Sequence, residues 1–439
     1  MRFIHHAMVI VAVLCVPLAQ AQQNPPAPVH QLRLSLSEAL NLARHNSVSY
    51  QLALTNAGVA REDKKQALAT LLPSVVYDNS AIYSQGTGID DTPKFIASNA
   101  VHEYISQANI HEAIDPAAFA EFRRKGAAAA VAKAQAEVAS RGLVVTVVQN
   151  YWGMAAAQLK LEALQKAADE GEGFLKLTQD LEHGGEVAHA DVIKAQLQVN
   201  DRRRQLQAAR LALLNARLDL AVLIFPNFNN NFEIADDLHA SANMPSLEEF
   251  QQRSAQRNPE IHAAIESVRE SDYAVASSRA GFLPSLGFDY LYGIDATRFA
   301  TRTDGISNLG SGAAVTLNIP IWNWGSTQSK VKQAELRREQ AKRELSLSQR
   351  KLLAEIQSLY AEAETASSDL ASLNQSAELA TESLRLTTLR YKSGEATVFE
   401  VVDAQNTAAT ANVAYQDGAL KFRVTLANLQ TLTGDLVTQ

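Results

Sequence analysis

The 439-residue sequence has one cysteine, Cys15, and a single long apolar run, which extends from Ala7 to Ala19. The run follows a basic start at Met1-Arg2 and precedes Ala19-Gln20-Ala21, a pattern typical of a secretory signal peptide cleaved after Ala21. Leu14 stands where a lipoprotein signal has a small residue before its cysteine. We therefore expect an exported mature chain that contains no cysteine and carries no acyl group.

Later segments lack the roughly 18 consecutive apolar residues of a transmembrane helix. Any membrane contact of the mature chain is therefore expected from strands or from a surface. Positive charge is scarce as well, because the formal net charge is −7 and the pI is near 5.9. The one basic cluster, Arg202-Arg203-Arg204, fits a solvated helix face. These features exclude nucleic acid as an expected partner.

Catalytic patterns are missing too: the sequence has no GxSxG, no P-loop and no dinucleotide fingerprint. The stretch from His111 to Asp115 resembles a zinc-protease helix, but it lacks the second histidine and lies in a strand pattern. His183 and His189 flank a turn and lack the helical spacing of metal ligands. We expect a protein that is not an enzyme and that needs no cofactor or metal.

A duplicated turn between two long helical patterns organises the sequence. It reads TLRYKSGEATVFEVVDAQ over 388–405, and its earlier copy reads EHGGEVAHADVIKAQ over 182–196. Gly185 precedes Gly394 by 209 positions, and each glycine suits the left-handed position that ends a helix. Thr397 is a candidate N-cap for the helix that follows. The sequence therefore predicts two helical hairpins of the same design.

Two pairs of strands are indicated by apolar residues that recur with a period of two. The expected strands lie at about 75–84, 100–114, 286–295 and 313–321, with loops at 86–93 and 301–311 between the members of each pair. Aromatic side chains collect on one expected face, which suits either lipid and its boundary or the core of a soluble sandwich; they are Tyr77, Tyr83, Phe288, Tyr290 and Tyr292.

Helical spacing predicts helices over 34–70, 117–182 and 187–224, and the second of these would be about 100 Å long. From Leu352 to Leu384 the apolar residues step by four and three, and a similar seam continues from Val401 to Leu429. This 3.5-residue repeat predicts left-handed coiled-coil packing. The Leu-Pro-Ser steps into the first strand of each pair are 211 positions apart. We therefore divide the chain into a signal peptide (1–21) and two structural repeats (22–237 and 238–439).

Four strands of this length resemble the strands of membrane barrels, but four strands cannot close a barrel. An open sheet would leave exposed edges. The expected fold class is accordingly mainly α with a membrane β-barrel part, in an oligomer to which each chain contributes four strands.

The sequence resembles the TolC-like outer-membrane efflux protein family over nearly all of its mature length. The resemblance is carried by the order, spacing and duplication of short elements: Leu36-Ser37-Glu38-Ala39-Leu40, Leu72-Pro73-Ser74, Leu283-Pro284-Ser285, Arg390-Tyr391 before Gly394, Glu400 through Asp403-Ala404, and Leu432-Thr433-Gly434. The resemblance implies a homotrimer with a twelve-stranded barrel and a helical tunnel. It also implies an outer-membrane location and work with a periplasmic adaptor and an inner-membrane transporter.

The same resemblance places Glu400 and Asp403 in an acidic ring at the periplasmic entrance, although two acids on a solvated helix turn would read alike. It makes Asp191 and Tyr391 candidate gate contacts, with coiled-coil packing as the alternative for the tyrosine. It makes Gly185 and Gly394 the tips that meet the adaptor.

One position departs from the family pattern. Ala396 stands where a basic residue can lock the closed entrance, which leaves Lys392 and Lys194 as substitutes.

The resulting interpretation is an export channel, and the alternative is a periplasmic coiled-coil scaffold without a pore. The cargo is not specified, because no Met-rich or His-rich tract indicates metal and a wide polar lumen suits drugs, metals or polypeptides alike.

Overall fold

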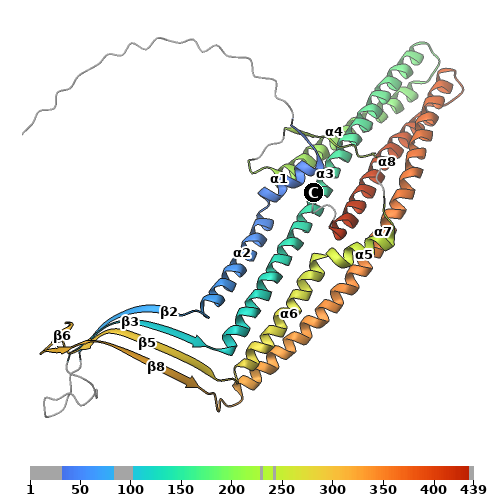
Figure 1. The fold of residues 1–439 in the computed structure, drawn as a ribbon. Coiled ribbons are helices and arrows are strands. Elements are labelled where there is room, and N and C mark those ends of the chain that lie inside the picture. Colours follow the sequence, from blue (N-terminus) through green and yellow to red (C-terminus); the bar gives the residue numbers. More distant parts are fainter. Residues whose placement is uncertain (1–31, 84–101, 228–230, 241–243, 435–439) are drawn as a thin grey trace, which may run out of the picture.

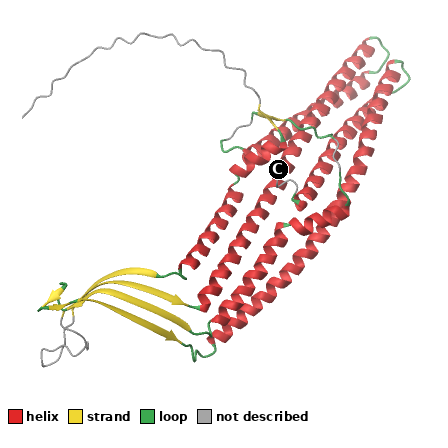
Figure 2. Ribbon diagram, viewed as in Figure 1, coloured by secondary structure: helices red, strands yellow, loops and turns green. Residues whose placement is uncertain are grey.

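The computed structural model describes residues 32–83, 102–227, 231–240 and 244–434. Figure 1 shows an elongated chain with long curved strands at one end and two helical hairpins at the other. The helices dominate, and the strands extend from one end of the helical layer (Figure 2). The expected signal peptide, Cys15 and the loop at 86–93 lie outside the described residues.

The first half of the chain builds a pair of helices, a pair of strands and a long hairpin. In order, its elements are β1 (Leu32–Leu34), α1 (Leu36–Asn46), α2 (Val48–Ala69), β2 (Ser74–Tyr83), β3 (His102–Ile114), α3 (Pro116–His183) and α4 (His189–Ile224).

The second half repeats this order and adds a small hairpin at the far end of the sheet. Its elements are β4 (Phe232–Ile234), α5 (Leu247–Arg257), α6 (Pro259–Ala280), β5 (Ser285–Ala296), β6 (Arg302–Thr303), β7 (Ile306–Ser307), β8 (Leu309–Asn318), α7 (Ser326–Lys392) and α8 (Val398–Thr433).

The helix expected over 34–70 is wrong in one respect, because the chain breaks it at Ser47. This residue is extended, with ψ at 113°, and its hydroxyl accepts from the Tyr50 amide to cap α2. The second half has the same break at Asn258, which is extended because Pro259 excludes the helical region for the residue before it. Each half thus begins with two consecutive helices.

The four long strands form one antiparallel sheet in the order β2-β3-β5-β8. Part of the loop expected at 301–311 is instead the β6–β7 hairpin, whose turn uses positive φ at Asp304 and Gly305. The last strand ends at Asn318 and not at 321, because Pro320 has no amide hydrogen for the ladder. The sheet joins the two halves through the pairing of β3 with β5.

The long helices form a single layer that continues from the sheet. Next to the strands, α2 contacts α3, α3 contacts α6 and α6 contacts α7; towards the tips, α3 lies between α4 and α8, and α8 packs on α7. The predicted seam from Leu352 to Leu384 is confirmed, because its ten positions are all buried or half-buried. At 68 residues, α3 is about 100 Å long.

A compact core lies where the first hairpin meets α1 and the short β1–β4 pair. Tyr151, which is fully buried, donates from its hydroxyl towards the Leu34 carbonyl and the Asp236 carboxylate, each at 2.8 Å. Asp236 also accepts from the Leu36 amide at 2.7 Å. Burial raises the pKa of Tyr151, and the hydrogen bond to Asp236 raises it further. This network ties the start of α1 to the middle of α3.

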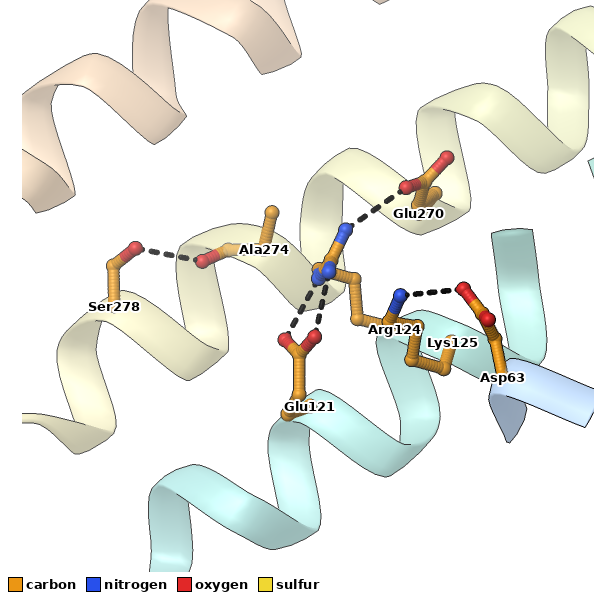
Figure 3. Close-up of polar contacts among 7 residues, drawn as sticks. All are labelled: Asp63, Glu121, Arg124, Lys125, Glu270, Ala274 and Ser278. Atoms are coloured by element: carbon orange, nitrogen blue, oxygen red, sulfur yellow. Dashed lines mark hydrogen bonds and ion pairs between the residues drawn. The ribbon is translucent and has the colours of Figure 1, made fainter. Parts of the chain in front are cut away.

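Charged side chains connect the helices nearer the sheet (Figure 3). Arg124 on α3 bonds Glu121 at 2.6 Å and reaches Glu270 on α6 at 3.1 Å. Lys125 reaches Asp63 on α2 at 2.8 Å. The side-chain hydrogen bond to Glu121 raises the pKa of Arg124, so this guanidinium stays charged and holds its two partners.

None of the helices in the described parts of the chain is both long and apolar enough to cross a membrane.

Gly293 on β5 is predicted to be essential to the pairing of β5 with β3. A Cβ at this position would lie 2.2 Å from the Ser106 carbonyl oxygen and 2.5 Å from the Gln107 Cα, so the strands would have to separate. Gly293→Ala should destabilise the protein by about 1–3 kcal/mol, as overpacked sites do.

The matched control is Gly287→Ala on the same strand, where the nearest atom would be the Thr316 carbonyl oxygen at 3.8 Å. Thermal unfolding of the detergent-purified variants, followed by circular dichroism, measures the difference. Equal melting temperatures for the two variants would contradict the close approach at Gly293.

Candidate functional site at the hairpin tips

The two hairpin tips have the same backbone geometry. Gly185 has φ of +78° and Gly394 has φ of +75°, a region in which glycine carries no steric penalty. The Glu186 amide donates to the Leu181 carbonyl at 2.9 Å, and the Glu395 amide donates to the Arg390 carbonyl at 2.9 Å. Both tips thus end their first helix with the same left-handed cap. The predicted duplication of the turn is visible in its hydrogen bonds.

The return helices begin differently in the two hairpins. Thr397 caps α8, accepts from the Glu400 amide at 3.3 Å and donates its own amide to Glu400 Oε1 at 3.1 Å. This reciprocal pair is a capping box. The equivalent residue before α4 is Ala188, which provides no side-chain cap. The second tip is therefore the more firmly closed of the two.

Glu400 is already engaged within its own tip. The backbone and side-chain hydrogen bonds of Thr397 lower the pKa of this carboxyl, and Arg390 adds to the shift with Nη1 3.5 Å from Oε2. Asp403 lies one turn further along α8 and is exposed. The two acids predicted for a ring are thus close along one helix, but only Glu400 has a local structural role in capping α8.

The basic residue at this turn is Arg390, whose role the sequence alone did not reveal. Besides Glu400, it bonds the Glu395 carbonyl at 3.0 Å and so closes the loop of the second tip. Of the two suggested substitutes for the missing base, Lys392 is exposed. The other, Lys194, lies over the Phe399 ring at 5.9 Å. Spacing could have indicated Arg390, because it stands ten residues before Glu400 across a short turn.

Tyr391 is buried between the two hairpins, with 4% of its surface exposed. Its ring packs edge-on against Phe174 of α3, with the centroids 5.1 Å apart. Burial raises its pKa and nearby Asp191 adds to the rise, whereas the neighbouring Thr178 hydroxyl acts in the opposite direction. The structure therefore brings Tyr391 and Asp191 together. The packing of Tyr391 on Phe174 joins the hairpins inside one chain, and Ala396 packs against the same cluster.

The strand register places the predicted lipid-facing aromatics on one face of the sheet. Tyr77 pairs with Ala108, which in turn pairs with Tyr292. Because side chains alternate along each strand, the remaining three share that face; they are Tyr83, Phe288 and Tyr290. The opposite face is richer in polar groups and carries the His111–Asp289 pair at 2.6 Å. The sheet thus has an aromatic, apolar face and a more polar one.

Two tryptophans that the sequence analysis did not single out extend the apolar surface beyond the sheet. Trp322 and Trp324 follow β8, are 74% and 88% exposed, and meet edge-on at 5.8 Å. Trp324 adopts a positive φ of 55°, which is uncommon for a bulky residue. The sequence could have indicated these two residues, because they directly follow a strand whose apolar and polar residues alternate as in membrane strands. Tryptophan is enriched at membrane boundaries.

Among the described residues no group of three or more histidine, cysteine or acidic side chains could hold a metal ion.

The capping role of Glu400 predicts a pH-dependent tip. Because the folded pKa lies below the ordinary value of 4.5, the stabilisation by the carboxylate is present above that pH and is lost as the pH falls through the lowered pKa. Glu400→Gln should therefore lower the hydrogen-exchange protection of the amides at 397–401 at pH 7. The difference from wild type should vanish when the pH falls below the lowered pKa of Glu400.

Asp403→Asn is the control, since it removes an exposed acid one turn away without touching the cap. Equal protection in wild type and Glu400→Gln at neutral pH would refute the capping contribution.

Comparison with known proteins identifies relatives of matching architecture. Residues 251–435 match the family model described as "Outer membrane efflux protein". The protease secretion protein PrtF of Dickeya chrysanthemi is 22% identical over 395 residues, which are 85% of this chain and 82% of the relative. The outer membrane protein TolC of Vibrio cholerae is 25% identical over 314 residues, covering 70% of this chain and 71% of the relative.

Solved structures agree in fold. The CmeC outer membrane channel of Campylobacter jejuni superposes with a TM-score of 0.79 at 18% identity, covering 91% of this chain and 85% of that one. The outer membrane protein VceC of Vibrio cholerae gives a TM-score of 0.79 at 18% identity, with 91% and 96% covered. This chain therefore resembles outer-membrane efflux proteins in sequence over residues 251–435, and it shares its fold with outer-membrane channels of known structure.

Proposed function

We propose that three copies of this chain form an outer-membrane channel through which substrates leave the periplasm. The observation that carries the proposal is the sheet: four strands with an apolar aromatic face, a more polar face, and two outer strands that pair on one side only. In a membrane, backbone groups on such edges must be paired, and strands achieve this by closing into a barrel. Three copies supply twelve strands, which is enough for closure.

The lateral edges of the helical layer support the same assembly. No residue of α2 is buried in the single chain, and apolar side chains are exposed along it. At the opposite edge, α7 also exposes a series of leucines. These surfaces lie on the same two sides of the chain as the open strands β2 and β8 (Figure 1). Lateral association would cover the edges of the sheet and of the helices at once.

In the proposed assembly the helices form a tunnel that continues the barrel into the periplasm. The repeats 22–237 and 238–439 each contribute one hairpin, and residues 1–21 direct export. The conduit has no catalytic role of its own. An inner-membrane transporter supplies the driving energy, and a periplasmic adaptor contacts the tips at Gly185 and Gly394. One relative is named for protease secretion and the family for efflux, so export is the function that these names share.

Gating is proposed at the tips. If the threefold axis of the trimer lies on the side of Glu400 and Asp403, the three chains bring six carboxylates together around it. These carboxylates attract cations and repel each other. Movement of one hairpin against the other would separate Tyr391 from Phe174 and Asp191. The entrance is therefore expected to resist opening until the adaptor contact offsets the loss of this packing.

The experiment is conductance in a planar bilayer. Wild-type trimers should give small, cation-selective openings that multivalent cations block from the entrance side. The Glu400→Ala, Asp403→Ala double variant should lose most of this selectivity and block, because the carboxylates that hold the cations are gone.

A double variant of equal charge, Glu364→Ala with Asp369→Ala, alters exposed acids midway along α7 and serves as the control. Identical conductance in all three proteins would contradict the assignment of the acidic ring but would remain consistent with a channel. Stable trimers that never conduct, or release of the protein by osmotic shock, would favour the periplasmic scaffold instead.

A further inference from the structure

A groove of about 630 Å³ runs between α3, α4 and α8, away from the tips. Its volume falls within the range of pockets that hold small organic ligands, roughly 300–1,000 Å³. Small and aliphatic residues make up its apolar lining; they are Gly153, Ala156, Ala157, Ala208, Ala209, Ala212, Ala409, Leu164, Leu420 and Val413. The groove therefore offers an apolar trough wide enough for a flat or extended hydrocarbon.

The charges in this groove are of one sign. Among its lining residues only Lys160 and Arg202 are charged, although the whole chain has a net charge of −7. Lys160 is neutralised by an ion pair with Asp417. Arg202 has no carboxylate of the described residues within ion-pairing distance, and it is the cation that determines what the groove attracts.

Arg202 is held in place by neutral groups. Its side chain is 3% exposed and donates to Gln205 Oε1 at 2.8 Å and to Asn406 Oδ1 at 2.7 Å. These amide oxygens orient the guanidinium but leave its charge unbalanced, and a buried charge without a counter-ion is costly. Burial lowers the pKa of Arg202 while Asp201 and Glu170 oppose the shift, yet arginine stays protonated at neutral pH. The site thus holds a buried guanidinium that no carboxylate of the described residues pairs with directly.

The groove opens on the same face of α8 as the proposed acidic ring. Asp403 and the lining residues Asn406, Thr410 and Val413 follow one another at steps of three and four, which places them on one helix face. Under the proposed function this face looks into the tunnel, so the groove would lie in the tunnel wall behind the entrance.

We propose that this groove binds an amphipathic organic anion, with its apolar body on the alanine surface and its carboxylate or sulfonate on the Arg202 guanidinium. A guanidinium donates charge-assisted hydrogen bonds to the oxygens of such a head group. In the trimer, three grooves beyond a cation-attracting entrance give amphipathic anions a holding site inside the duct. The location in the tunnel rests on the proposed function, whereas the binding itself does not.

The test uses two fluorescent probes with one apolar body: 1-anilinonaphthalene-8-sulfonate and N-phenyl-1-naphthylamine, which lacks the sulfonate. Both are titrated into trimers in lipid nanodiscs, with empty nanodiscs subtracted. The sulfonate should bind roughly ten- to a hundredfold more tightly than the neutral probe, as expected for charge-assisted hydrogen bonds. Arg202→Gln should abolish that preference and leave binding of the neutral probe unchanged.

Arg203→Gln is the matched control, because Arg203 is exposed and paired with Glu172 at 2.8 Å. It should behave as wild type. Ala208→Phe, at an exposed lining position, should weaken both probes by filling the trough, and it keeps the test valid if Arg202→Gln does not assemble. Equal affinities of the two probes for wild type, or equal effects of the two arginine variants, would overturn the proposal.

Bilayer current separates this inference from the proposed function. If the sulfonate probe shows the Arg202-dependent binding and also reduces current in wild type but not in Arg202→Gln, both stand. Arg202-dependent binding to trimers that do not conduct would support the groove and count against the channel.

Discussion

The backbone groups on the outer sides of β2 and β8 are the constraint on which the proposed architecture depends. A four-stranded sheet with an apolar aromatic face cannot leave two rows of amides and carbonyls unpaired next to lipid. Gly293 shows how closely the inner strands approach, since no side chain fits between β5 and β3 at that point. Four helices follow from the sheet, because each adjoins one of its strands along the chain and inherits its place in the layer; they are α2, α3, α6 and α7.

The hairpins show how one duplicated design supports two different roles. Both tips use the same left-handed glycine cap, but only the second has a capping box and a closing arginine. The first contributes Phe174, whose ring packs on Tyr391 of the second, and Asp191, whose charge acts on the same tyrosine. Aromatic packing therefore joins the two hairpins within the chain, although Ala396 stands where the family that the sequence resembles has a base. Arg390 binds inside its own hairpin and does not substitute for that base across the two hairpins.

Arginine side chains are paired differently at two levels of the helical layer. Near the sheet, Arg124 of α3 is paired with two carboxylates, Glu121 of the same helix and Glu270 of α6. Closer to the hairpin tips, Arg202 of α4 is surrounded by side-chain amides and by the apolar trough. The first arrangement is self-contained and links two helices, α3 and α6. The second leaves a buried guanidinium without a directly paired carboxylate in the lining of a groove, which is the physical basis for assigning it to a ligand.

Local chemistry made much of this protein readable from its sequence alone. Period-two alternation determines which strand residues share a face, and a 3.5-residue repeat determines which helix face is buried, so the sheet face of Tyr77 and the seam from Leu352 to Leu384 were both predictable. Glycine at 185 and 394 and the threonine at 397 specify their turns through backbone freedom and capping. The break at Ser47 was missed, because a serine cap inside a continuous helical pattern has no signal comparable to the proline at 259.

Only the tertiary structure decided which side chains from distant segments meet. The burial of Tyr391 against Phe174, the use of Glu400 as a cap with Arg390 beside it, and the isolation of Arg202 among amides depend on how the two hairpins pack. Sequence periodicity reports the face on which a residue lies; the residue that faces it across a helix interface is set by the relative shift and rotation of the two helices, which no local pattern encodes.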